Sequence, residues 1–123
     1  MAKILIVEDE KVLNEAYELV LRKEDYDVAV ALDGEEAYKK FKDDPADLVL
    51  LDLRMPNLDG VGFLRKLEPK KNHPNAKIIV FSNYDDQKEV KDAIDLGADR
   101  YILKAWSSPS ELVKIVKETL EQD

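Results

Sequence analysis

The sequence predicts an α/β protein that is doubly wound around one five-stranded parallel sheet. Short apolar runs of strand length recur along the chain, and stretches with helical spacing of apolar residues separate them. The two kinds of segment alternate strictly, which is typical of parallel strands joined by right-handed crossovers. Most of the runs are unbroken, as expected of strands that are buried on both faces, so we expect helices on both sides of the sheet.

Five apolar runs are predicted to form the strands. They are residues 4–7, 28–31, 48–51, 78–81 and 101–103. The second run also shows the alternation of Val28 and Val30, which is a further strand signal.

Five helices are predicted between and after these strands, because apolar residues recur there with helical spacing. They lie around residues 13–20, 37–41, 63–67, 90–94 and 112–116. Gly97 follows the fourth helix as a stop signal, and Ser108, Pro109 and Glu111 form a capping box before the fifth. Residues 69–76, PKKNHPNA, are expected to be a polar loop in which His73 is solvated.

Composition limits the classes of function. The 123 residues suit a single domain, here residues 1–123, and 45% of them are apolar, enough for one core. The net charge of -8 argues against direct binding to nucleic acid or to anionic membranes. The chain contains no cysteine, signal sequence or membrane span, so we expect a cytoplasmic protein without thiol chemistry.

Functional side chains follow four of the five predicted strands. Glu8 and Asp9 come after the first, Asp52 ends the third, Ser82 follows the fourth and Lys104 follows the fifth. In doubly wound sheets, ligands bind outside the carboxyl ends of the strands, so these side chains are expected to meet. Clustered carboxylates repel each other and therefore favour a bound cation, most plausibly Mg²⁺.

Phosphoryl transfer is the chemistry that suits this set, because it depends on positioning and on cationic stabilisation. Asp52 can attack as a carboxylate nucleophile. Asp9 and Asp52 are expected to hold Mg²⁺, with Glu8 acting through water. Ser82 and Lys104 can then take the remaining phosphoryl oxygens.

Four motifs in this order give the chain a family resemblance. It resembles the receiver domain of two-component response regulators, as a stand-alone domain, over its whole length. The motifs are VEDE at 7–10, LLDLRMPNLDG at 50–60, FSN at 81–83 and DLGADRYILK at 95–104. The resemblance implies a flavodoxin-like strand order of 2-1-3-4-5.

The resemblance also implies site roles and partners. Asp52 would accept a phosphoryl group from a histidine kinase or a histidine phosphotransfer protein, and Lys104 would contact the phosphoryl oxygens. Glu8, Asp9 and the main-chain carbonyl of Arg54 would hold Mg²⁺. Ser82 would move toward the phosphoryl group and Tyr101 would rotate inward. The resemblance therefore implies that the protein is a signalling switch rather than an enzyme with its own substrate.

Two features of this sequence refine the expectation. The family usually has proline after the lysine, whereas this chain has Ala105. A cis peptide bond without proline costs about 2.5 to 4 kcal/mol. We therefore expect the Lys104–Ala105 bond to be trans. Arg54 and Tyr84, each two residues beyond a site residue, are expected to flank the approach of water to the aspartyl phosphate.

Three other functions compete with this one. A calcium loop fails because Met55 and Lys66 stand where acidic ligands are needed. An aspartate-nucleophile phosphatase needs a second acid at the position of Arg54. A receiver-like adaptor that binds partners without phosphorylation stays open because of Ala105. With no output domain in the sequence, the signal is expected to leave through a downstream protein target.

Overall fold

A computed structural model describes residues 1–83, 86–106 and 108–122 of the chain. Its strands are β1 (Lys3–Val7), β2 (Asp27–Ala31), β3 (Leu48–Asp52), β4 (Lys77–Ser82) and β5 (Arg100–Leu103). Its α-helices are α1 (Lys11–Lys23), α2 (Gly34–Asp43), α3 (Gly60–Leu67), α4 (Pro69–Asn72), α5 (Gln87–Asp95) and α6 (Pro109–Leu120). A 3-10 turn, Lys104–Trp106, follows β5.

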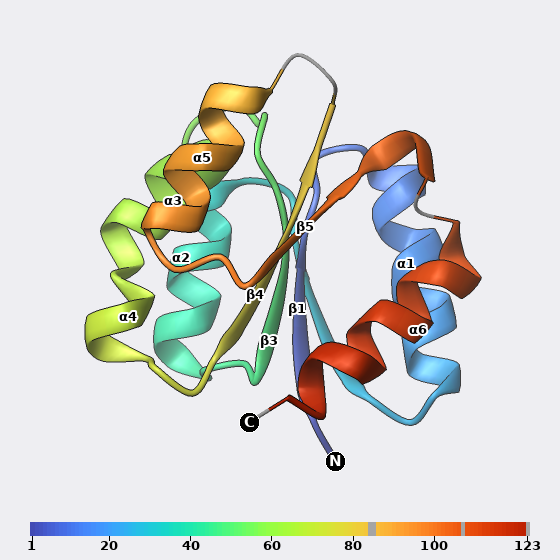
Figure 1. Cartoon of the computed structure of the whole chain (residues 1–123). Helices are drawn as coiled ribbons and strands as arrows, with labels where there is room; N and C mark the ends of the chain where they lie inside the picture. Colours follow the sequence, from blue (N-terminus) through green and yellow to red (C-terminus); the bar gives the residue numbers. More distant parts are fainter. Residues whose placement is uncertain (84–85, 107, 123) are drawn as a thin grey trace.

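The five strands form one parallel sheet in the order β2-β1-β3-β4-β5, as the sequence predicts. In the centre of the sheet, Val7 of β1 pairs with Leu51 of β3, and Asp52 pairs with Phe81 of β4. All carboxyl ends therefore lie at the same edge, which is at the top of Figure 1. The doubly wound prediction is confirmed.

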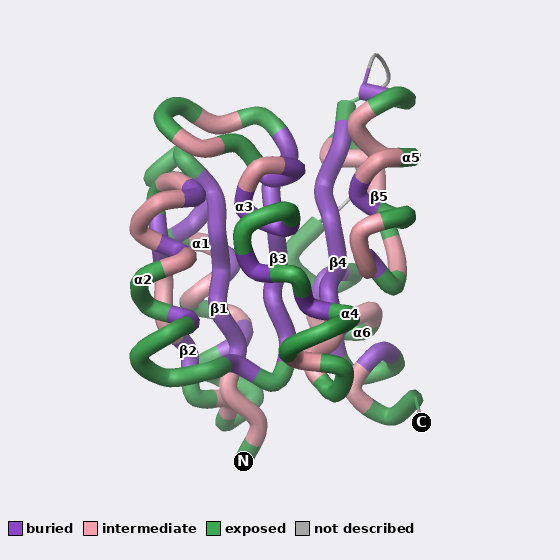
Figure 2. The backbone as a smooth tube through the Cα atoms, turned by 90° about the vertical axis from the view of Figure 1, so that its left-hand side faces the viewer, coloured by how far each residue is buried: buried purple, intermediate pink, exposed green. Residues whose placement is uncertain are grey.

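Helices cover both faces of the sheet. In Figure 1, α1 and α6 lie on one side, and α2, α3, α4 and α5 lie on the other. The central strands are buried while the outer surfaces of the helices are exposed, as Figure 2 shows. This layering explains why the strands of the centre read as unbroken apolar runs.

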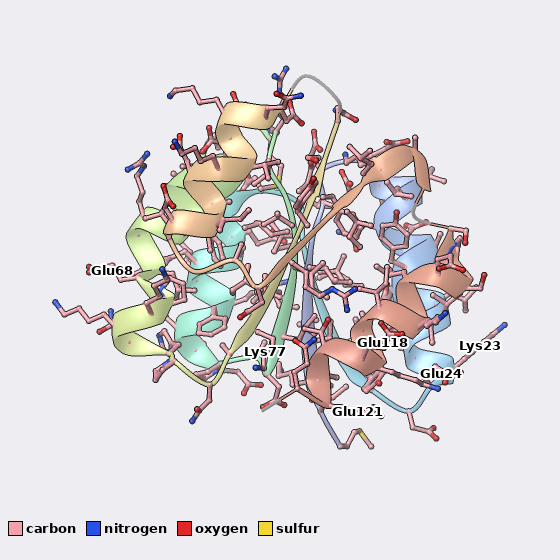
Figure 3. The ribbon with its side chains drawn as sticks, viewed as in Figure 1. Lys23, Glu24, Glu68, Lys77, Glu118 and Glu121 are labelled. Carbon is pink, nitrogen blue, oxygen red and sulfur yellow. The ribbon has the colours of Figure 1, made fainter. Side chains whose placement is uncertain are left out.

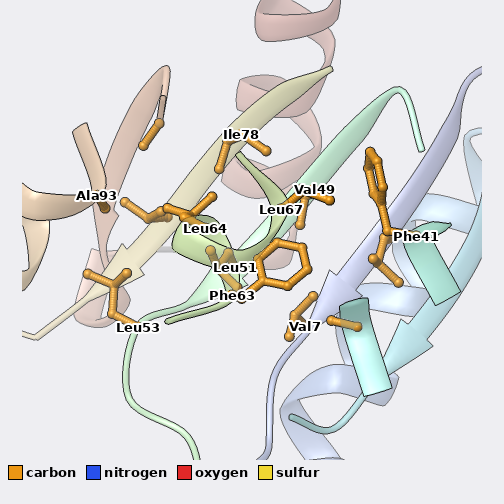
Figure 4. Close-up of a cluster of buried hydrophobic side chains, with 14 of the residues drawn as sticks. Val7, Phe41, Val49, Leu51, Leu53, Phe63, Leu64, Leu67, Ile78 and Ala93 are labelled. Atoms are coloured by element: carbon orange, nitrogen blue, oxygen red, sulfur yellow. The ribbon is translucent and has the colours of Figure 1, made fainter. Parts of the chain in front are cut away.

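Each face of the sheet has its own hydrophobic cluster. The cluster beneath α2, α3 and α5 includes Phe41, Leu51 and Phe63 (Figure 4). The cluster beneath α1 and α6 includes Tyr17, whose ring stacks on Phe81 at a centroid distance of 5.4 Å. Both clusters reach the carboxyl edge of the sheet, so the side chains at this edge are attached to a rigid base.

Ion pairs link the helices of the second face. Lys117 of α6 pairs with Glu24, which ends α1, and Glu118 of α6 pairs with Arg100 of β5 at 3.4 Å. Figure 3 labels Glu24 and Glu118 on this side of the molecule. Such largely exposed pairs contribute little stability.

The predicted ends of the later helices agree with the structure. Gly97, two residues after the end of α5, has a φ of 123°, which a glycine adopts without strain. Ser108 Oγ accepts a hydrogen bond from the Glu111 amide at 3.3 Å, and Pro109 is the first residue of α6. The capping interaction of Ser108 is therefore confirmed.

The segment 69–76 differs from the prediction, which made it a polar loop. It begins with the one-turn helix α4, in which the Asn72 amide donates to the carbonyl of Glu68 at 2.9 Å. Pro69, which is buried, starts this turn at the position where proline is favoured. His73 is half-buried and its ring meets the ring of Phe41 edge-on at 4.7 Å, so the expectation of a solvated histidine is wrong.

None of the helices in the described part of the chain combines the length and the apolar character that crossing a membrane requires.

Candidate functional site

Glu8 and Asp9, which follow β1, differ in their exposure to solvent. Glu8 is completely buried and its carboxylate accepts a hydrogen bond from the Glu10 amide at 3.1 Å, whereas Asp9 is exposed. The Glu8 amide donates to the carbonyl of Ala31 at 3.1 Å, which continues the pairing of β1 with β2. At the carboxyl edge of the sheet, Glu8 is therefore enclosed by the protein, whereas Asp9 faces the solvent.

Asn14 of α1 holds this loop in place. Its side-chain amide donates to the carbonyls of Glu8, at 3.0 Å, and of Ala31, at 3.1 Å, although the residue is buried. The sequence interpretation missed this residue. The available signal was a polar residue on the buried face of a helix, in line with Tyr17 and Leu21.

Asp52 is the last residue of β3 and is only 3% exposed. Its Oδ1 atom receives a long hydrogen bond of 3.4 Å from the Arg54 amide. The start of α3 presses against the same strand end: a Cβ atom added to Gly60 would lie 2.6 Å from the carbonyl oxygen of Asp52. Only glycine allows this approach, so the backbone of Asp52 is closely confined.

Lys104 places its ammonium between two buried acids. Its Nζ atom lies 3.0 Å from Glu8 Oε1 and 3.1 Å from Asp52 Oδ2. The lysine starts the 3-10 turn after β5, and the described residues contain no cis peptide bond, so its bond to Ala105 is trans as predicted. The trans loop still brings the ammonium to the acids.

Burial and mutual repulsion shift the pKa values of this trio. Burial raises the pKa of Glu8 to about 7, with a further increase from Asp52. Burial also raises the pKa of Asp52, although the Lys104 ammonium opposes this shift. Burial acts to lower the pKa of Lys104, but the two carboxylates outweigh it and the net shift is upward. One cation thus stabilises two buried acids, and Glu8 keeps a proton toward neutral pH.

Three carboxylates form a potential metal centre at this edge. One oxygen each from Glu8, Asp9 and Asp52 lies within 4.8 Å of the others. Hard divalent cations such as Mg²⁺ and Ca²⁺ prefer such oxygen ligands, so the donor set fits a divalent ion of this kind. The cluster could hold a metal, and the negative charge of its carboxylates would attract a cation.

Ser82 and Tyr101 lie on neighbouring strands, and both face α5. Ser82 ends β4, is buried and pairs with Leu103 of β5. Tyr101 of β5 is 54% exposed, so much of its side chain is open to solvent. Both residues line a groove of about 450 Å³ whose other wall is α5, with Val90 and Ile94.

An ion pair joins the loops that follow β3 and β4. Arg54 Nε pairs with Oδ1 of Asp86, and the Asn83 amide donates to Asp86 Oδ2 at 2.8 Å. Sequence reasoning gave Arg54 a role but missed Asp86, because the acid precedes a helix and reads as an ordinary cap. Tyr84, the other residue expected to flank the approach of water, lies outside the described residues.

The fold and the site together define a class: a receiver-like α/β domain with an acid cluster and a lysine at the carboxyl edge. A family model described as the response regulator receiver domain matches residues 4–117. The chain therefore belongs to the response regulator receiver domain family, whose members act in two-component signalling.

Two curated relatives are response regulators or regulators of transcription by name. The chain is 37% identical over 115 residues to the response regulator ArlR of Staphylococcus saprophyticus, with 94% of this chain and 51% of that protein covered. It is 38% identical over 120 residues to the probable transcriptional regulator ycf27 of Porphyridium aerugineum, covering 98% and 48%. The chain thus spans about half the length of these relatives.

Solved receiver domains have the same fold. A response regulator receiver domain protein (CheY-like) from Methanospirillum hungatei superposes with a TM-score of 0.90 at 29% identity, covering 98% of this chain and 94% of that one. The receiver domain of NtrX from Brucella abortus superposes with a TM-score of 0.84 at 27% identity, covering 98% and 99%.

Proposed function

We propose that residues 1–123 form a phosphoacceptor switch in which Asp52 takes up the phosphoryl group. The carrying observation is the placement of Asp52 at a buried strand end, 3.1 Å from the Lys104 ammonium and clustered with Glu8 and Asp9. A buried acid that is held beside a cation and an open acidic cluster is suited to in-line attack on a phosphoryl group. The family membership supports the same role.

The transfer step forms one bond and breaks one bond. A carboxylate oxygen of Asp52 attacks the phosphorus of a phosphohistidine, the P–N bond breaks, and the imidazole leaves with its electron pair and takes a proton from solvent. The negative charge that develops on the equatorial oxygens is stabilised by cations and hydrogen-bond donors. Lys104 is the cation already in place, and Ser82 is the hydroxyl donor at the neighbouring strand end.

The acid cluster is proposed to hold Mg²⁺ through Asp9, Asp52 and the main-chain carbonyl of Arg54, with Glu8 acting through water. When bound, this ion neutralises charge on the donor's phosphoryl oxygens and so lowers their repulsion from Asp52. Arg54 carries its carbonyl in the loop directly after Asp52. The positive charge of the bound metal would also neutralise the carboxylates that Lys104 contacts, so that the Lys104 ammonium would be available to the phosphoryl group.

The proposed partners are a histidine kinase or histidine phosphotransfer protein on the input side and a protein target on the output side. We propose that the output face is formed by α5, β5 and α6, because Ser82 and the exposed Tyr101 connect the acid cluster to the groove there. Inward movement of Ser82 opens space for the Tyr101 ring. The net charge of -8 supports a role without direct binding to nucleic acid.

The decisive experiment is intact mass spectrometry after incubation with Mg²⁺ and acetyl phosphate. The wild-type protein is expected to gain one phosphoryl group, because a single acid is placed for attack, and Asp52→Asn is expected to gain none. Asp59→Asn is the matched control: it alters an exposed acid that caps α3 in the same loop, and asparagine also caps helices well.

Phosphorylation of Asp52→Asn at the wild-type level would rule out the assignment. A wild-type protein that folds and binds Mg²⁺ but gains no phosphoryl group would instead favour the adaptor alternative.

A further inference from the structure

We propose that Arg54 is a cation shared between two anions, Asp86 and the phosphoryl group on Asp52, and that Asp86 is the positioning residue that holds it in the resting state. This inference rests on the proposed function, since it concerns the stability of the phosphorylated form. It assigns a role to a buried acid outside the metal cluster.

Asp86 is a buried acid that is hydrogen-bonded to Asn83, directly after β4, and to Val90 in α5. The residue is 1% exposed, its Oδ2 atom accepts from the Asn83 amide at 2.8 Å, and its own amide donates to the carbonyl of Asn83 at 3.1 Å. Its carbonyl also starts α5 by accepting from the Val90 amide at 2.9 Å. Asp86 therefore cannot move without disturbing the turn after Ser82 and the first turn of α5.

Arg54 is the exposed partner of the pair. Its side chain is 53% exposed, whereas that of Asp86 is 2% exposed. The Arg54 guanidinium can therefore leave Asp86 by rotating through solvent, without opening the core. Its backbone is anchored two residues beyond Asp52, where its amide contacts Asp52 Oδ1 at 3.4 Å.

Phosphorylation changes the competition for this arginine. The phosphoryl group makes Asp52 more negative by up to about one charge, and its oxygens match the planar guanidinium fork. When Arg54 turns to the phosphoryl group, Asp86 is left buried without its cation, which is unfavourable. The turn at Asn83 and the start of α5 must then rearrange, which transmits the event from β3 to α5.

Removal of the competing charge tests the proposal through the lifetime of the aspartyl phosphate. Hydrolysis occurs when water attacks the phosphorus and the P–O bond to Asp52 breaks, giving inorganic phosphate and the carboxylate. In Asp86→Asn, Arg54 no longer has a competing anion there, so it should shield the phosphoryl group more and lengthen the lifetime about fivefold, as expected for one partly exposed ion pair.

Two comparison proteins make the result specific. In the Arg54→Gln background, the added Asp86→Asn change is expected to have no effect on lifetime, because the shared cation is missing. Asp99→Asn is the matched control: Asp99 accepts from the Ile78 amide at 2.7 Å near the opposite edge of the sheet, and its loss should leave the lifetime unchanged. A fivefold change that persists without Arg54, or no change in Asp86→Asn, would overturn the proposal.

A spectroscopic measurement on the wild-type protein covers the case in which Asp86→Asn does not fold. The chain contains four arginines, so the NMR signal of the Arg54 Nε–Hε group can be assigned by one substitution. This signal is expected to shift when Asp52 is phosphorylated. If the mass shows phosphorylation but the Arg54 signal is unchanged, the exchange of Arg54 from Asp86 to the phosphoryl group is refuted. If the proposed function itself fails, the protein takes up no phosphoryl group at all.

Discussion

Glu8 carries the most consequential pKa shift among the described residues. Its burial raises the pKa to about 7 from an ordinary 4.5, and the Lys104 ammonium only partly offsets this because Asp52 shares it. The folded protein therefore binds more protons than the unfolded chain between these two pH values. Stability that comes from this proton is complete below pH 4.5 and is lost as the pH rises through 7.

We therefore predict that the metal-free protein loses stability relative to Glu8→Gln as the pH rises from about 4.5 to 7. The difference between the two proteins should change by at most on the order of 3 kcal/mol, because glutamine stays neutral at every pH. Urea unfolding in chelator, followed by circular dichroism at several pH values, measures it.

Glu35→Gln serves as the control, since it removes a carboxylate that is only partly buried, in the first turn of α2, where it pairs with Lys66 at 3.5 Å. A wild-type protein whose stability runs parallel to that of Glu8→Gln across this range would show that Glu8 has no raised pKa.

At the scale of elements, the contact between the start of α3 and the end of β3 confines Asp52. A Cβ atom at Gly60 would lie 2.6 Å from the Asp52 carbonyl oxygen and 2.8 Å from Leu53 Cα, and neither of these backbone atoms can yield easily. A Cβ atom at Gly62 would instead meet the flexible side-chain end of Leu58, at 2.6 Å. The two glycines thus form a matched pair on one helix.

We predict that Gly60→Ala destabilises the protein by about 1 to 3 kcal/mol, the usual range for an overpacked site, and slows phosphorylation because the Asp52 backbone shifts. Gly62→Ala should change stability much less. Thermal unfolding and the rate of labelling by acetyl phosphate provide the two measurements. Similar losses in both variants would mean that the contact at Gly60 does not confine Asp52.

The sheet was predictable because its central strands, β1, β3 and β4, are buried on both faces. An unbroken apolar run such as residues 48–51 is favourable only where both faces of the strand are buried. The alternation of such runs with helices then predicts a parallel sheet with helices on both sides. The short helix α4 was not predictable, because PKKNHPNA has no apolar periodicity and its turn depends on Pro69 being buried by the fold. The edge-on contact of His73 with Phe41 depends on the same packing.

The acid cluster was predictable in its membership but not in its resting contacts. Strand ends fix where Glu8, Asp52 and Lys104 come together, yet only the structure shows that the ammonium bridges the two acids. Arg54 and Asp86 are 32 residues apart in the sequence (86 - 54) and pair across two loops. Local sequence patterns carry no information on contacts over such a separation. The roles of the site residues stay predictions for the experiments above.

For the whole molecule, a divalent ion at the acid cluster should couple to folding, because the cluster exists only when the carboxyl ends of β1 and β3 come together. We predict that Mg²⁺ raises the melting temperature, with a gain of about 2.7 kcal/mol at 100 times its dissociation constant. Asp9→Asn should lose most of this gain, since it removes the exposed ligand without altering the core.

Sodium chloride at equal ionic strength is the control, because a protein with a net charge of -8 is stabilised by any cation that screens repulsion. An equal shift in melting temperature for the wild type and Asp9→Asn would place the effect outside the cluster.

The turn that begins at Lys104 also provides an intrinsic optical signal. The chain contains one tryptophan, Trp106, and it lies in the same 3-10 turn as the lysine. Tryptophan emission is sensitive to backbone rearrangement, and in the proposed function this turn rearranges when Lys104 exchanges a carboxylate for a phosphoryl oxygen. Stopped-flow fluorescence can therefore follow metal binding, phosphoryl uptake and hydrolysis in unlabelled protein, one turnover at a time.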